Sequence, residues 1–228
     1  MVQILQEYGP LLLKSMGNTL LLALCGLFFA CILGLIFGIL SVVHNKVCNI
    51  IAQVFVDAIR GVPMIVLAYF IYFGIPYGIN SAFDAGFTLS ALQAGTICLA
   101  LNCGAYMAEI IRGGIQSVDI GQMEAARSLG LPYSKAMRKV VLPQAIKTMI
   151  PSIINQFIIT LKDTSILSII GFPELVNEAN SVVAITFKSF QVWFIVGIMY
   201  LIVITALSKL AKHIERRMAK GERHRDKH

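Results

Sequence analysis

The chain has 228 residues, of which 57% are hydrophobic and 14% charged, and its mean hydropathy is +0.77. Soluble domains have about a quarter of their residues charged, so this composition excludes an ordinary soluble domain and indicates a membrane protein. The formal net charge is +7, which basic connections on one side of a membrane explain more simply than nucleic-acid binding does. None of the five cysteines belongs to a C-x-x-C pair, so neither a metal site nor a disulfide framework is indicated.

The first apolar segment, residues 16–43, contains no ionisable residue. A helix needs ~20 residues to cross a hydrocarbon core of ~30 Å, and this segment also exceeds the apolar region of a signal peptide. We therefore expect it to stay in the protein as the first transmembrane helix. Three of its residues are small enough to let a neighbouring helix approach closely: Gly26, Gly34 and Gly38.

Four more apolar segments are predicted to span the membrane: 61–83, 89–111, 147–171 and 190–208. In the second of these, Pro76 and Gly78 predict that regular helix ends near Gly74. The connections carry most of the charge. We expect residues 44–60 to form a cytoplasmic turn with an interfacial or helical lead-in, 84–88 a short loop and 172–188 a polar connection.

Lysine and arginine gather in alternate connections, which sets the orientation by the positive-inside rule. One side of the membrane receives most of them, whereas the other receives only Lys14 and Lys188. The sequence therefore predicts an all-α membrane protein with five transmembrane helices, its N-terminus outside and its C-terminus in the cytoplasm. In this arrangement residues 1–14 are an extracytoplasmic segment, 15–209 the transmembrane domain and 210–228 a basic cytoplasmic tail.

The polar stretch between the third and fourth spans is predicted to form a helix–turn–helix. Asp119 can cap the start of the first helix, and Gln122 three residues later completes a capping box. Gly130 then occupies the position that needs a left-handed backbone. Ser134 can cap a second helix, which we expect to stop before Pro143. Three basic residues mark the solvated face of that second helix: Lys135, Arg138 and Lys139.

The same stretch resembles the EAA motif of binding-protein-dependent ABC importer permeases. The likeness rests on residues 124–126, which read Glu-Ala-Ala, on Gly130 and on Leu142-Pro143. Val140 stands where the family usually has isoleucine. Three further segments resemble the polar amino-acid uptake subfamily: 60–63, 106–115 and 161–165. Together these motifs extend the resemblance over most of the chain, from about Ser15 to Lys209.

The resemblance implies a type I transmembrane domain with a cytoplasmic coupling helix that enters a groove of a separate ATPase. Glu124, Ala125 and Ala126 would face that groove, and Gly130 would set the turn. A simpler interpretation is that Glu124 only stabilises the start of its own helix through the helix dipole. The chain has no P-loop motif, so ATP and Mg²⁺ would bind to the partner ATPase and no cofactor to this chain.

Further partners follow from the same resemblance. They are a second permease subunit, identical or related, an extracytoplasmic solute-binding protein and a small polar amino acid. The protein would be a multi-pass component of a bacterial plasma membrane and a transport subunit rather than an enzyme. An ATP-independent secondary transporter is the alternative, although such folds often consist of two matching halves with broken helices. Five spans do not divide in this way.

Two polar stripes on apolar helices indicate where substrate would bind. An ionised residue in the middle of a span costs ~2.5–3.5 kcal/mol on insertion scales, which makes Asp163 a functional candidate. Gln156 and Thr160 lie on the same helical face, and Asn102 and Tyr106 repeat this spacing on the third span. We interpret the five residues as the lining of a cavity near the midplane. Polar contacts between helices, typically worth under ~1 kcal/mol each, are the alternative.

The charges in and near this cavity suggest the class of substrate. The ammonium group of an amino acid could pair with Asp163, whereas a cationic side chain would need a second carboxylate. Because position 156 is Gln, we expect an uncharged polar amino acid such as glutamine or cystine. Glu109 and Arg112, three residues apart at the cytoplasmic boundary, are predicted to form a structural ion pair.

Overall fold

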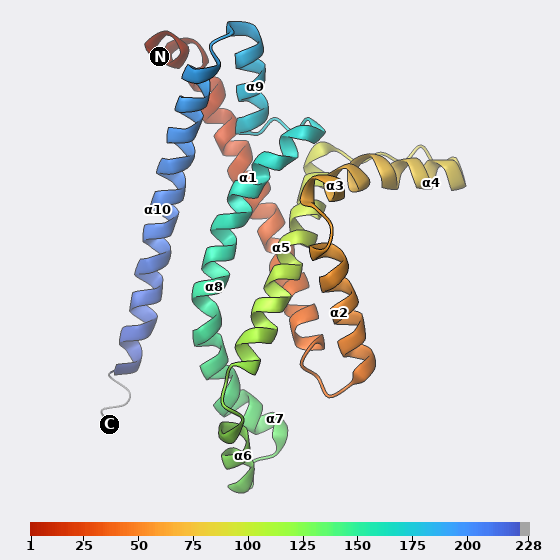
Figure 1. Cartoon of the computed structure of the whole chain (residues 1–228), viewed down its shortest axis with the longest axis vertical. Helices are drawn as coiled ribbons and strands as arrows, with labels where there is room; N and C mark the ends of the chain where they lie inside the picture. The colour runs from red at the N-terminus through yellow and green to blue at the C-terminus, as the bar shows by residue number, and fades with distance from the viewer. Residues whose placement is uncertain (224–228) are drawn as a thin grey trace.

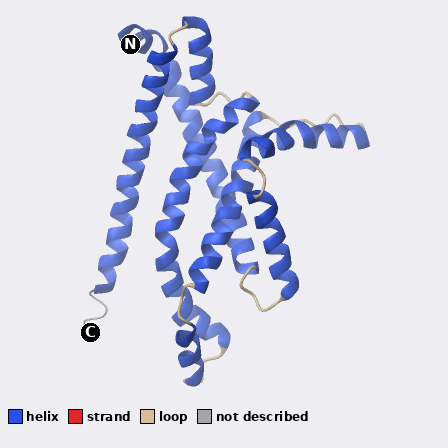
Figure 2. Ribbon diagram, in the orientation of Figure 1, coloured by secondary structure: helices blue, strands red, loops and turns tan. Residues whose placement is uncertain are grey.

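The computed structural model describes the backbone of residues 1–223 and the side chains of residues 1–213. Figure 2 shows helices joined by loops, with no strand in the part of the chain described. The α-helices are α1 (Val2–Leu40), α2 (Lys46–Arg60), α3 (Met64–Tyr69), α4 (Ile75–Phe83), α5 (Ala91–Gln116), α6 (Ile120–Ser128), α7 (Tyr133–Ala136), α8 (Leu142–Asp163), α9 (Leu175–Thr186) and α10 (Ser189–Arg223). Two π-helical turns and a 3-10 segment complete the helical elements: Phe70–Gly74, Met137–Val141 and Thr164–Ile170.

Five helical segments within the described residues are long and apolar enough to cross a membrane: Val2–Leu40, Met64–Phe83, Ala91–Gln116, Tyr133–Ile170 and Ser189–His213. This confirms the predicted all-α fold with five membrane-spanning helices. Most of the predicted basic tail, 210–228, has a helical backbone, because α10 continues to Arg223. Residues 224–228 and the side chains from residue 214 on lie outside the described part.

The long helices run along one axis of the molecule, as Figure 1 shows for α1, α5, α8 and α10. The helices α6 and α7 lie at the lower end, and α9 lies at the upper end beside the N-terminus. The stretch from α3 to α4 projects sideways from the bundle, crosswise to the long helices. The second predicted span is therefore a helix that leaves the bundle after the break at residues 61–63.

The segment ahead of that break is a helix, α2, in agreement with the helical form of the expected lead-in. Asn45 caps α2, its side chain accepting from the backbone N–H groups of Val47 at 2.9 Å and Cys48 at 3.4 Å. Ala52 and Val56, one helical turn apart, are buried, and α2 packs against α5 and α1. The helix is amphipathic, which explains both its charges and its place beside the bundle.

The helix α1 begins at Val2, so the predicted N-terminal segment 1–14 and the first span form one continuous helix. Pro10 lies inside it. A proline removes one backbone hydrogen bond and bends a helix, but it does not have to end one. Ile4 and Leu12 are buried in a cluster with residues of α9 and α10, and this packing holds the first turns in place. The extracytoplasmic location of residues 1–14 stays a prediction.

Two predicted helix ends are wrong, and the reason is the same at both. Regular helix does not end near Gly74, and the helix after the turn does not stop before Pro143. A π-helical turn ends two residues before Pro76 in one case and two residues before Pro143 in the other. The proline ring clashes with the carbonyl group four residues earlier, and a widened turn moves that carbonyl away. The helix therefore continues through both prolines.

The predicted glycine contacts of the first span are present along α5. A Cβ atom added at Gly26 would lie 2.5 Å from the Cβ of Leu99, and one added at Gly34 would lie 2.5 Å from the Cβ of Met107. These separations are far shorter than any ordinary contact between carbon atoms. The two helices are thus in backbone-to-backbone proximity over several turns, which is how small residues stabilise helix pairs in membranes.

A buried polar cluster joins four helical elements at the upper end. The Glu174 side chain is fully buried and caps α9, accepting from the Asn177 N–H at 2.5 Å. Its other oxygen accepts from the Tyr200 hydroxyl of α10 at 3.3 Å. Thr19 of α1 accepts from the Leu175 N–H at 3.0 Å. The side chain of Asn177 donates to the Ser168 carbonyl of the 3-10 segment at 3.0 Å. These hydrogen bonds join α1, the 3-10 segment, α9 and α10.

The segment predicted to be a polar connection does link the fourth and fifth spans, but most of it is the helix α9, which was not predicted. Leu175, Ala179 and Val182 are buried on one face of α9 and pack into the cluster with α1 and α10. Their spacing of four and three residues is a helical signal. The polar residues between these three positions lie on the opposite face of the helix, and they make the segment as a whole look like a polar connection.

Candidate functional site

A cavity of about 540 Å³ lies where α2 breaks into α3, and α5, α8 and the following 3-10 segment complete its walls. Four of the five predicted substrate residues line it: Asn102, Tyr106, Gln156 and Asp163. Thr160 is buried at 1% exposure and does not belong to the lining. The two polar stripes therefore face one cavity, although they come from helices about 50 residues apart in the chain.

The amides in the cavity wall are well buried. Asn102 is 9% exposed and Gln156 is 6% exposed, and the Asn102 side-chain nitrogen lies 3.8 Å from the Met64 sulfur. Asp163 forms no salt bridge with the side chains that the structure describes. Its neighbour Lys162 is exposed. The carboxylate is thus available to a cationic group inside the cavity.

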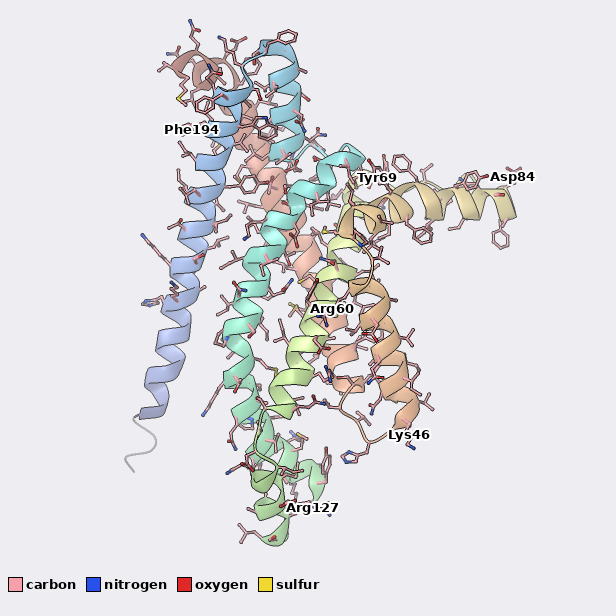
Figure 3. The ribbon with its side chains drawn as sticks, in the orientation of Figure 1. Lys46, Arg60, Tyr69, Asp84, Arg127 and Phe194 are labelled. Atoms are coloured by element: carbon pink, nitrogen blue, oxygen red, sulfur yellow. The ribbon has the colours of Figure 1, made fainter. Side chains whose placement is uncertain are left out.

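Arg60 also lines the cavity and was not predicted to do so. Its guanidinium lies 5.0 Å from the centre of the Tyr106 ring and 3.8 Å from a Glu109 carboxylate oxygen. Glu109 pairs with Arg112 as predicted. A cation over an aromatic face contributes ~0.5–1 kcal/mol at an exposed site and more when desolvated. Figure 3 places Arg60 in the middle of the molecule, at the end of α2.

The sequence held one signal for Arg60: it directly precedes the Gly-Val-Pro helix break. Broken membrane helices are typical of binding sites in transporters. With Arg60 from α2 and Asp163 from α8, the cavity offers one cation and one anion. Such a pair of opposite charges matches the carboxylate and ammonium groups of an amino acid.

The predicted docking helix is α6, and its caps differ in part from the prediction. Asp119 caps it as expected, accepting from the Gly121 N–H at 2.6 Å. The predicted capping box is absent, because the Gln122 side chain instead accepts from the Gln144 amide of α8 at 3.4 Å. Ser134 is not a cap either. It lies inside the first turn of α7, which starts after Pro132 and has no side-chain cap.

The end of α6 agrees with the prediction. Gly130 has φ of +83°, which L side chains rarely adopt. Its N–H donates to the Arg127 carbonyl at 2.9 Å, and the Leu131 N–H donates to the Ala126 carbonyl at 3.2 Å. These two bonds form a Schellman motif, which ends the helix sharply. The predicted solvated face of the next helix is also present, since three basic side chains are exposed: Lys135, Arg138 and Lys139.

The three residues of the EAA motif do not share one environment. Glu124 and Ala125 are exposed, but Ala126 is 5% exposed and lies inside the chain's own fold. Sequence reasoning missed two apolar side chains at the ends of the same helix: Ile120 is 74% exposed and Leu129 is 84% exposed. Ile120 and Leu129 thus flank the exposed Glu124 and Ala125 of the motif.

The family described as binding-protein-dependent transport system inner membrane component matches residues 30–220. The chain is 36% identical over 209 residues to the glutamine transport system permease protein GlnP of Escherichia coli (strain K12), which covers 92% of this chain and 93% of that protein. It is 30% identical over 213 residues to the arginine transport system permease protein ArtQ of Bacillus subtilis (strain 168), covering 93% and 94% of the two chains.

Solved structures show the same fold. A crystal structure of an amino acid ABC transporter with histidines is 37% identical in sequence, covers 93% of this chain and 96% of its own, and superposes with a TM-score of 0.85. An inward-facing MetNI methionine ABC transporter superposes with a TM-score of 0.75 at 18% identity, covering 92% and 97% of the two chains. At that identity the second likeness concerns the fold alone.

Proposed function

Since this chain belongs to the family of inner membrane components of binding-protein-dependent transport systems, we propose that it is the permease subunit of an ATP-driven importer for a polar amino acid. The family places it in the membrane as a multi-pass transport component rather than an enzyme. The observation that carries the amino-acid assignment is the cavity whose wall holds both Arg60 and Asp163. The amino-acid permeases among its relatives support the same assignment.

In this proposal, each end of the substrate is held by a charge of opposite sign. The Arg60 guanidinium binds the carboxylate, and Asp163 binds the ammonium group. The amides of Gln156 and Asn102 then face the substrate side chain, where they can donate and accept hydrogen bonds without a net charge. This favours an uncharged polar substrate such as glutamine or cystine. A cationic side chain would meet no second carboxylate in this wall.

The energy comes from a separate ATPase that binds ATP and Mg²⁺. We place its contact on α6, where Glu124 and Ala125 are exposed between Ile120 and Leu129. The two apolar side chains act as anchors in the ATPase groove, and Ala126 allows α6 to pack closely on its own chain. Closure of two ATPases draws the docking helices of two permease subunits together and opens the cavity outward. A binding protein delivers substrate at the opposite face.

The test is uptake by liposomes that contain the complex purified with its native partners. We expect uptake of glutamine or cystine that requires both ATP and the binding protein, with little uptake of arginine. Transport at the same rate without ATP would establish the secondary-transporter alternative. Selective uptake of arginine would retain the importer and overturn the substrate class.

The docking surface has its own test, which uses two substitutions at one position. Gly130→Val places a β-branched residue at φ of +83°, where it is strained, so the end of α6 must change. Asn tolerates this conformation, so Gly130→Asn is the matched control. We expect the ATPase to co-purify with wild type and with Gly130→Asn but to be depleted from Gly130→Val. Equal recovery with both variants would contradict docking through α6.

A further inference from the structure

A second and larger cavity lies at the lower end of the bundle, away from the charged residues proposed to bind substrate. It encloses about 780 Å³ between the ends of α1, α5 and α8. Its walls are aliphatic side chains from all three helices, including Leu35, Ile39, Ile111, Ile115, Ile146 and Met149. Several of them are open to the outside, since Leu35 is 55% exposed and Ile146 is 49% exposed. The space is thus an open apolar groove rather than part of the closed core.

One end of the groove is polar and basic. Arg127 of α6, His44 and Tyr133 line it there, and the His44 ring meets the Tyr133 ring edge-on at 5.1 Å. Arg127 forms no salt bridge with the side chains that the structure describes. Figure 3 shows Arg127 and Lys46 at the same lower end of the molecule. The groove therefore runs from aliphatic walls to an exposed cation that forms no salt bridge within the described part of the chain.

The groove continues past His44 into an adjoining space of about 530 Å³ whose walls are part apolar and part polar. Ser41, Asn49 and Gln116 line this space. Asp119 also borders it, but its carboxylate is engaged by the Gly121 N–H in the cap of α6. This space can take a hydrated polar group that follows an apolar chain.

From this arrangement we propose that the groove binds an anionic phospholipid, with its acyl chain along α1 and α8 and its phosphate beside Arg127. On α1 the groove follows the last helical turns from Leu35 to Ile39, about 6 Å at 1.5 Å per residue, and it continues over Val42 and Val43 beyond the end of the helix. Basic pockets between membrane helices are the sites that bind acidic headgroups.

The charge of the groove decides between a lipid and a second protein chain as its occupant. An apolar helix from another subunit would fill the aliphatic part but would leave Arg127 facing it without a counter-ion. An anionic lipid fills the apolar walls and also supplies that counter-ion. The assignment does not depend on the substrate, because none of the groove's wall residues belongs to the charged cavity described above. Arg127 does lie on α6, where we place the ATPase contact.

The first test uses the wild-type complex, released from neutral detergent in a mass spectrometer that preserves bound lipids. Phosphatidylglycerol and phosphatidylcholine with identical acyl chains are offered at equal concentration. We expect phosphatidylglycerol to be retained about fivefold better, the effect of one cation near a membrane surface. Equal retention of the two lipids by wild type would overturn the proposal.

Two variants with matched controls locate the site. Arg127→Gln is expected to abolish the preference for phosphatidylglycerol, while Lys135→Gln, an exposed cation outside the groove, keeps it. Ile39→Trp fills the groove and should reduce retention of both lipids, whereas Leu24→Trp, on an exposed face of α1 outside the groove, should not. Equal effects of the two charge variants would contradict the site. A cross-linker placed at Ile39→Cys that joins a second permease chain would also overturn it.

Discussion

Asp163 carries a charge whose burial among membrane helices costs free energy, and the same charge can bind substrate. A carboxylate among membrane helices is unfavourable unless something pairs with it, and the described part of the chain supplies no salt-bridge partner. Its carboxylate lines the cavity together with the guanidinium of Arg60. A substrate ammonium group would therefore complete the charge balance of this wall.

We predict that Asp163→Asn weakens uptake of the substrate strongly. Loss of one charge-assisted hydrogen bond costs about 1.5–3 kcal/mol, which corresponds to a rise of roughly 10-fold to 100-fold in the KM for uptake. Lys162→Gln, at the exposed neighbouring position, is the control and should transport normally. The measurement is the concentration dependence of uptake by liposomes. An unchanged KM for Asp163→Asn would show that this carboxylate does not contact substrate.

The charge state of Glu174 affects the stability of the folded protein. Burial raises the pKa of Glu174 from its ordinary value of 4.5 to about 7, against the opposing effect of its backbone and Tyr200 hydrogen bonds. Glu178 adds to the rise through repulsion. The folded protein therefore holds this proton more tightly than the unfolded chain does. The resulting stabilisation is complete below pH 4.5 and is lost as the pH rises through about 7.

We predict that the thermal midpoint of the wild-type protein in detergent decreases between about pH 5 and pH 8 because of this group. Glu174→Gln can still accept the bond from Asn177 but cannot ionise, so its midpoint should change much less over the same range. Glu178→Gln, at a position in the first turn of α9 that is only half-buried, is the comparison and should retain most of the pH dependence. Identical pH profiles for wild type and Glu174→Gln would refute the assignment.

At the scale of the elements, the pairing of α1 with α5 is the main contact of the bundle. It depends on glycine because the two backbones approach so closely that no side chain fits between them. A Cβ at Gly34 would also lie 3.3 Å from the Gly104 carbonyl oxygen. A rigid backbone atom cannot move aside as a flexible side chain can, so this position tolerates no added carbon without separating the helices.

We predict that Gly34→Ala destabilises the protein by about 1–3 kcal/mol, the usual cost of overpacking. Gly17→Ala is the control on the same helix, because nothing lies within 4 Å of a Cβ at that position. It should be neutral or slightly stabilising, since alanine favours helix more than glycine does. Thermal unfolding in detergent measures both. A Gly34→Ala protein as stable as Gly17→Ala would show that the helices separate readily.

The two π-helical turns allow two helices to continue past proline residues. Each one lets a helix pass a proline at which a boundary is expected, and each is followed by helix on the far side. At Pro143 the consequence is structural continuity from α7 through α8 to Ile170. One continuous helical stretch thus joins α7 to the wall of the cavity at Asp163. We propose that movement of the docking region reaches Asp163 along this stretch.

At the scale of the whole molecule, charge and shape define two ends. Figure 3 shows Lys46 and Arg127 at the lower end and Asp84 at the tip of the projecting arm near the upper end. The positive-inside rule predicts that the lower end is cytoplasmic and that the N-terminus is outside. The helix α10 approaches the bundle at the upper end and diverges from α8 below, as Figure 1 shows, which leaves a face for the second permease subunit that we propose.

We predict that the two ends differ in their access to reagents in intact cells. A membrane-impermeant thiol reagent should label Asp84→Cys and leave Ser128→Cys, on α6, unlabelled until the cells are opened. The wild-type chain, with its five cysteines, provides the background. Labelling of Ser128→Cys in sealed cells, with Asp84→Cys protected, would reverse the orientation.

The sequence alone determined the features that depend on neighbours along the chain. The number of spans follows from runs of apolar residues long enough to cross a bilayer. The cap at Asp119 and the left-handed turn at Gly130 follow from the local chemistry of helix ends. The stripes that contain Asn102 and Asp163 follow from helical periodicity. In each case the controlling residues lie within a few positions of one another.

Only the tertiary structure decided what depends on contacts between distant segments. The burial of one face makes α9 a packed helix although its sequence is polar, and the contact with Gln144 takes Gln122 out of the predicted capping box. The side chain of Arg60 enters the cavity because α2 packs beside α5, which places Tyr106 and Glu109 within its reach. Local propensities of ~1 kcal/mol or less are readily overridden by such packing, so residues close in sequence could not reveal these outcomes.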